Sequence, residues 1–121
     1  MTDYSAFTLL HVTIEDRVAF ATIDAPPMNV MVRALFSQLA KFGNAVADDD
    51  DVRAVVLRSD DPDFFIAHFD VSLISTFPFE TPAEKPSELS GFHLMCETYR
   101  TMAKPTIAEI AGRVGGGGNE L

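Results

Sequence analysis

The residues with the clearest potential for chemistry lie near the C-terminal end of the sequence. Four consecutive glycines, residues 115–118, are followed by Asn119 and Glu120. An apolar stretch over residues 106–111 precedes them, so the pattern predicts a strand, a turn and the start of a helix. Glycines leave the backbone amides uncovered, and the dipole of a helix N-terminus favours negative charge there. The segment therefore predicts an oxyanion hole, with a close-packed structural turn as the alternative.

Two nucleotide-binding motifs fail on this glycine run. A phosphate-binding P-loop would end in Gly-Lys-Ser/Thr, whereas Gly118 is followed by Asn119. The dinucleotide frame G-x-G-x-x-G meets Val114 when it starts at Gly112, and it meets Glu120 when it starts at Gly115. The sequence therefore disfavours a nucleotide cradle and, with it, a dehydrogenase.

Other titratable residues give weaker signals. Glu120 in the first turn of a helix could act as a general acid or base, or could simply interact with the helix dipole. The four aspartates of residues 48–51 lack the glycine and distal glutamate of a calcium loop, which favours a solvated turn. Cys96 lies at a core-type position and is interpreted as a small apolar side chain. No His, Cys and carboxylate set has metal-ligand spacing, so we expect no metal.

The elements that must position these residues follow from local patterns. Alternating and β-branched stretches predict a hairpin over residues 7–14 and Val18–Ile23. Apolar residues at spacings of three and four predict helices over 30–47 and 89–102. Short β-branched runs predict strands over 52–58 and 106–111, and Asp70 could cap a short helix over 71–75. The order β-β-α-β-α-α-β indicates an α/β fold with crossover connections.

Composition limits the class of protein. The formal net charge of −9 disfavours nucleic-acid binding, and 47% apolar residues allow a packed core. No stretch approaches the roughly 20 apolar residues of a membrane span, and the polar N-terminus does not resemble a signal peptide. One cysteine fits a reducing compartment and equally fits many secreted proteins, so the N-terminus leads us to expect a cytoplasmic protein without membrane contact. The length allows one domain or less, and the final helix start suggests truncation.

Two segments resemble one enzyme family. Residues 104–121 read KPTIAEIAGRVGGGGNEL, which resembles the crotonase (enoyl-CoA hydratase/isomerase) signature K-P-hydrophobic-I-A-x-hydrophobic-x-G-x-A-x-G-G-G-x-E-L. Residues 65–70 read FIAHFD and resemble the family segment F-x-A-G-A-D. The resemblance implies a crotonase-like α/β fold built of repeated ββα units. Residues 1–121 would form the N-terminal part of a single such domain, with the second half missing.

The resemblance also assigns catalytic roles. It implies that the backbone amides of Phe69 and Gly117 hold the thioester carbonyl of an acyl-CoA. Glu120 matches the first of two catalytic glutamates of the hydratases, and the second would lie beyond Leu121. Coenzyme A would enter as part of the substrate, so no separate cofactor is expected.

Further residues are expected to contact the substrate or its coenzyme A. The carbonyl of Ala67 matches the position that meets the adenine, and the Pro-rich loop of residues 26–29 matches the position beside the nucleotide arm. His68 replaces a family glycine, which could mean an altered substrate, a different proton donor or a tolerated change. The full expected set is Pro27, Met28, Ala67, His68, Asp70 and Gly116. Arg33 and Lys104 are candidate cations for the phosphates.

The resulting interpretation is an acyl-CoA enzyme, either an enoyl-CoA hydratase or an isomerase working through the same enolate. A hydrolase or dehalogenase of the same family would keep the two amides and change the side chains. The competing class is a non-catalytic binding module or an incomplete fragment held by partners. The resemblance further implies a homotrimer or hexamer.

Overall fold

The computed structural model describes residues 2–72 and 91–121. Within these two ranges, nine elements follow one another. They are β1 (Leu10–Glu15), β2 (Val18–Ile23), α1 (Arg33–Ala47), β3 (Ala54–Ser59), β4 (Phe64–Ile66), α2 (Gly91–Thr101), β5 (Thr106–Ala108), β6 (Arg113–Val114) and α3 (Gly117–Glu120). None of the helices in these two ranges is long and apolar enough to cross a bilayer.

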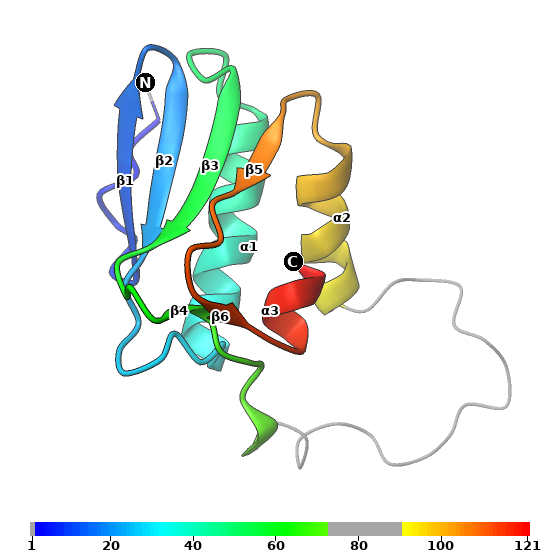
Figure 1. Cartoon of the computed structure of the whole chain (residues 1–121). Helices are drawn as coiled ribbons and strands as arrows, with labels where there is room; N and C mark the ends of the chain where they lie inside the picture. Colours follow the sequence, from blue (N-terminus) through cyan, green and yellow to red (C-terminus); the bar gives the residue numbers. More distant parts are fainter. Residues whose placement is uncertain (1, 73–90) are drawn as a thin grey trace, which may run out of the picture.

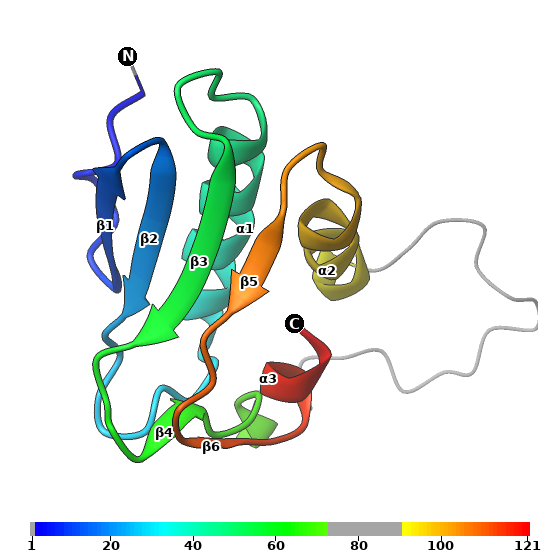
Figure 2. The same cartoon turned by 45° about the horizontal axis from the view of Figure 1, so that its top comes forward.

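A four-stranded sheet in the order β1-β2-β3-β5 forms one layer of the molecule. β1 and β2 pair antiparallel, whereas β2, β3 and β5 run parallel. α1 packs behind the sheet and α2 stands beside α1, next to β5 (Figures 1 and 2). The short parallel pair β4-β6 lies at the end of the sheet where α1 begins, close to α3. The glycine run therefore lies at the end of the sheet where α1 begins.

The core lies between one face of the sheet and the apolar face of α1. On β2, the alternate residues Ala19, Ala21 and Ile23 are fully buried. The facing stripe of α1 is also fully buried and consists of Leu35, Leu39, Phe42 and Val46. Two small alanines on the sheet leave room for the larger side chains of the helix, as close packing of an interior requires.

The predicted elements are confirmed in type, with shifted ends. α1 begins at Arg33 and not at residue 30, because Met31 is already paired with Phe69. The strand predicted over 106–111 ends at Ala108, and the following residues turn to form β6. The prediction missed β4 and β6, whose three and two residues are too short to show a period. A 3₁₀ turn begins at Val71, and the rest of the helix predicted over 71–75 lies outside the described residues.

The interpretation of residues 48–51 as a solvated turn is wrong for Asp49. Its side chain is 7% exposed and accepts a hydrogen bond of 2.6 Å from the Tyr4 hydroxyl. The Lys104 ammonium donates to the carbonyls of Val46 and Asp49 at the end of α1. These contacts hold the N-terminal segment, the C-terminus of α1 and the start of β5 together. The Tyr4 hydroxyl also holds the pKa of the Asp49 carboxyl below its ordinary value.

Tyr4→Phe should destabilise the protein in a pH-dependent way. We expect the free energy of unfolding at neutral pH to fall by roughly 1.5–3 kcal/mol, as for a hydrogen bond to a charged group. Because the pKa of Asp49 is lower in the folded state, its ionised form stabilises the fold. This contribution is lost as the pH falls from the ordinary value of 3.8 through the folded pKa. Urea unfolding at a series of pH values should show that the difference in free energy of unfolding between wild type and Tyr4→Phe becomes smaller in acid.

Tyr99→Phe is the matched control. The Tyr99 hydroxyl donates to the backbone carbonyl of Leu39, which does not titrate in acid. The free energy of unfolding that Tyr99→Phe removes should therefore stay constant over the same pH range. The same pH dependence for both variants would contradict the role given to Asp49.

Candidate active site

The glycine run forms the predicted turn and helix start, although the strand that leads directly into it is β6, which the prediction missed. β6 ends at Val114, and Gly116 adopts a positive φ of 48° that turns the chain into α3. The amides of residues 118–120 donate back to the carbonyls of Gly115 and Gly116 at 3.0–3.2 Å. The amide of Gly117, the first in α3, takes part in none of these bonds. It therefore lies at the start of the helix, where the amides of the first turn have no helical acceptor.

Residues 64–70 run alongside this glycine segment. Phe64 pairs with Arg113 and Ile66 pairs with Val114, and the Gly115 amide donates to the Ile66 carbonyl at 3.3 Å. A β-carbon placed on Gly117 would lie 3.1 Å from the β-carbon of Phe69. The structure therefore brings together the two residues whose amides were expected to form the oxyanion hole.

The backbone of Phe69 is oriented by a bridge to Met31. The Met31 amide donates to the His68 carbonyl at 2.8 Å, and the Asp70 amide donates to the Met31 carbonyl at 3.1 Å. In a parallel bridge of this kind, the residue between the two bonds directs its own amide and carbonyl to the other side. The Phe69 amide accordingly points away from Met31.

Close packing explains part of the glycine run. A β-carbon on Gly118 would lie 2.7 Å from both the carbonyl oxygen and the β-carbon of Ile66. A β-carbon on Gly112 would lie 2.6 Å from the backbone of Asp63 and Phe64. The structural alternative therefore holds at these two positions, because only glycine permits such an approach of two backbones.

Glu120 lies at the end of α3 with an exposed side chain. Burial raises the pKa of the Cys96 thiol, and the nearby carboxylate of Glu120 raises it further. A thiol held in its protonated form is a poor nucleophile. This agrees with the interpretation of Cys96, which is half-buried against the core, as a packing residue.

His68 and Asp70 are both engaged with nearby groups. The Nδ1–H of His68 donates to the Phe69 carbonyl at 2.7 Å, since a carbonyl can only accept. A histidine in place of the family glycine would be strained if the backbone there had a positive φ. The non-glycine residues with positive φ in the described ranges are Asp16, Arg17 and Asn29, so His68 is free of this backbone strain. Asp70 accepts from the amide and hydroxyl of Ser72 at 2.9 and 2.8 Å, which lowers its pKa and caps the 3₁₀ turn.

The Pro-rich loop lies beside residue 67. Pro27 and Met28 are exposed, and the Met28 carbonyl accepts from the Ala67 amide at 3.3 Å. The carbonyl of Ala67 faces Gly115, 3.0 Å from where a β-carbon would lie. Of the two candidate cations, Arg33 is exposed, whereas Lys104 is bound to the end of α1.

Three half-buried phenyl rings lie together beside the two residues of the expected oxyanion hole. The sequence did not single out this group of rings. Phe36, Phe69 and Phe92 lie with ring centroids 5.7–6.2 Å apart. The ring of Phe92 is 3.5 Å from the position of a β-carbon on Gly117. Phe36 and Phe92 fall within the two segments predicted as helices, and only the fold brings them together beside Phe69.

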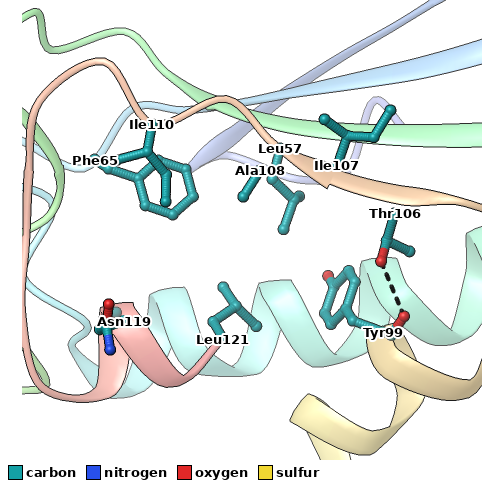
Figure 3. A pocket seen from close by; sticks show the side chains of 10 residues that line it. Leu57, Phe65, Tyr99, Thr106, Ile107, Ala108, Ile110, Asn119 and Leu121 are labelled. Atoms are coloured by element: carbon teal, nitrogen blue, oxygen red, sulfur yellow. Dashed lines mark hydrogen bonds between the residues drawn. The ribbon is translucent and has the colours of Figure 1, made fainter.

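A small cavity of about 130 Å³ lies next to this site but does not include it. Figure 3 shows it between β5 on one side and α2 and α3 on the other. Its lining is mainly apolar and consists of Leu57, Phe65, Tyr99, Thr106, Ile107, Ala108, Ile110, Gly118, Asn119 and Leu121. Neither Phe69 nor Gly117 nor Glu120 lines it. The described residues also contain no group of three or more His, Cys, Asp and Glu side chains that could hold a metal ion.

Comparison with known proteins identifies the family. A family model described as enoyl-CoA hydratase/isomerase matches residues 13–121. The chain therefore belongs to the enoyl-CoA hydratase/isomerase family, as its resemblance to the crotonases suggested. The mixed α/β, crotonase-like fold is also confirmed.

Solved structures agree with this assignment. A protein from Streptomyces avermitilis assigned as an enoyl-CoA hydratase is 34% identical with a TM-score of 0.79, and the match covers 95% of this chain and 43% of that one. DspI from Pseudomonas aeruginosa is 27% identical with a TM-score of 0.75 over 96% and 44% of the two chains. The enoyl-CoA hydratase from Bacillus anthracis, at 19% identity and a TM-score of 0.74, shows the fold alone over 93% and 43%. The chain thus spans less than half the length of these structures.

Gly118→Ala should destabilise the fold. The added β-carbon would meet the Ile66 carbonyl and β-carbon at 2.7 Å, and neither can swing away. We expect a loss of about 1–3 kcal/mol in the free energy of unfolding, measured by urea denaturation. Gly91→Ala is the control, because its β-carbon would lie 3.7 Å from the Phe36 ring and would favour helix, giving up to about 1 kcal/mol more stability. Similar effects of the two substitutions would contradict the packing argument.

Proposed function

We propose that the protein binds the thioester carbonyl of an acyl-CoA between the amides of Phe69 and Gly117. The reaction would be hydration of a 2-enoyl-CoA, or isomerisation through the same enolate. The observation that carries this proposal is the meeting of two separate backbone segments at these residues, 3.1 Å apart at the β-carbon positions. Membership of the enoyl-CoA hydratase/isomerase family supports it.

The two amides would act on charge that develops during the reaction. When a nucleophile adds to the β-carbon, or a proton leaves the α-carbon, electrons move onto the thioester oxygen. Donors already held by the fold stabilise that oxygen without reorganising. Loss of one such donor typically raises the barrier by about 2.7–4 kcal/mol. Gly117 also begins α3, where the amides of the first turn have no acceptor within the helix.

Glu120 is the proposed acid or base. It lies one turn after Gly117 on the same short helix, and its side chain is exposed. In hydration, the water oxygen bonds to the β-carbon while one water proton is removed. A proton is then delivered to the α-carbon, so the elements of water add across the double bond. Glu120 would carry one of these protons, acting with a second carboxylate of the whole protein.

The coenzyme A portion would lie along the remaining expected residues. The proposed contacts are the Ala67 carbonyl and the neighbouring Pro27, Met28, His68, Asp70 and Gly116. The pairing of Met28 with Ala67 supports this placement, because it puts the Pro-rich loop beside the thioester site. Coenzyme A is part of the substrate, so no separate cofactor enters the proposal.

The assembly and location belong to the same proposal. A homotrimer or hexamer in the cytoplasm, without membrane or nucleic-acid partners, fits the family and the net charge of −9. Ile107 and Ile110, each 52% exposed near β5, favour a surface that is covered in the whole protein.

Glu120→Gln tests the chemical role in the protein that carries this chain. We expect the turnover of a 2-enoyl-CoA, followed by loss of the absorbance of its conjugated double bond, to fall by about 10²–10⁴-fold. Glu109→Gln is the matched control, because Glu109 is an exposed glutamate after β5, and it should keep full turnover. Turnover within a few-fold of wild type in Glu120→Gln would remove Glu120 from the mechanism.

A further inference from the structure

Asn29 is a buried polar residue whose hydrogen bonds join three parts of the chain. Its side chain is 2% exposed, and its φ of 52° lies in the left-handed region. The side-chain oxygen accepts from the Ala25 amide at 2.9 Å, which closes the Pro-rich loop. The side-chain nitrogen donates to the Ser59 hydroxyl at 2.7 Å and to the Phe65 carbonyl at 2.9 Å. The loop is thus tied to the end of β3 and to β4.

The residues on either side of Asn29 hold the segment that contains Phe69. The Met28 carbonyl accepts from the Ala67 amide at 3.3 Å, and Met31 forms the bridge that surrounds Phe69. That bridge turns the Phe69 amide toward the side away from Met31. Asn29 stands between these two contact points, so a shift of Asn29 would move both. Figure 1 shows this loop beneath β4, at the end of the sheet where α3 also lies.

We propose that Asn29 is a positioning residue for the Phe69 amide of the oxyanion hole. Asn29 does not touch the substrate and acts only through the backbone that it anchors. The inference rests on the proposed function, since it assumes that this amide binds the thioester oxygen. A site of this kind loses effect when a donor moves by a fraction of an ångström.

The side-chain chemistry of asparagine fits this position. Asparagine tolerates the left-handed region better than most residues. It also offers an acceptor and two donors on a short side chain, and all of these directions are used here. Aspartate has nearly the same shape but no donor, so it would place an oxygen against the Phe65 carbonyl.

Binding of two coenzyme A ligands to the protein that carries this chain tests the inference. Butyryl-CoA has the thioester oxygen, whereas S-butyl-CoA lacks it and is otherwise nearly the same. By calorimetry, wild type should prefer butyryl-CoA, binding it about tenfold or more tightly than S-butyl-CoA, because two hydrogen bonds to the thioester oxygen are worth this much. In Asn29→Asp the preference should fall to about threefold or less, while S-butyl-CoA affinity stays within about twofold. Asn44→Asp, on the exposed side of α1, is the matched control and should keep the wild-type preference.

A milder variant keeps the test decisive if Asn29→Asp does not fold. Ser59→Ala removes one acceptor of the Asn29 nitrogen and leaves the Phe65 carbonyl in place, so we expect a smaller loss of the preference. A lower unfolding temperature with an unchanged preference would show that Asn29 is only structural, which overturns the inference and leaves the proposed function standing. If wild type binds neither ligand, or binds both equally, the proposed function itself fails and the inference fails with it.

Discussion

The arrangement of the site depends on the close approach of two backbone segments, residues 64–70 and 113–118. β4 and β6 pair over very few residues, and the contact continues because Gly118 lets α3 rest directly on Ile66. A side chain at that position would push the helix away from the strand. The distance between Phe69 and Gly117 is therefore set by backbone packing, which is stiffer than contacts between side chains. Such stiffness is what a pair of fixed donors requires.

Two buried polar residues hold the ends of the helix that supports this arrangement. Asn29 precedes α1 and ties the Pro-rich loop to β3 and β4, while Asp49 follows α1 and binds Tyr4. Lys104 completes the second end by donating to the carbonyls of Val46, in the last turn of the helix, and Asp49, just after it. Buried polar groups are costly unless every bond is made, so each of these residues admits one local geometry. The buried apolar face of α1 stabilises its packing on the sheet, and the hydrogen bonds at its two ends fix its position.

The local patterns of the chain predicted a large part of this result. The hairpin and β3 followed from alternating and β-branched runs, and α1 and α2 followed from spacings of three and four; all of these depend only on neighbouring residues. The glycine run correctly indicated a turn and a helix start. The ordered match of residues 104–121 to the crotonase signature predicted the family, which the comparison confirmed. The chemical roles of Phe69, Gly117 and Glu120 remain proposals that rest on that resemblance.

What the chain could not reveal locally are the contacts between distant residues. Lys104 reads as a free cation for a phosphate, yet it binds the end of α1 some 55 residues earlier. Asp49 reads as one of four solvated aspartates, until Tyr4 folds over it. Asn29 reads as a turn residue after two prolines, and only the packed structure brings Ser59 and Phe65 within reach of its side chain. Periodicity and glycine content are properties of neighbours along the chain, so they specify elements. Hydrogen bonds across the fold exist only once those elements have packed, so the tertiary structure alone decides which polar groups are used.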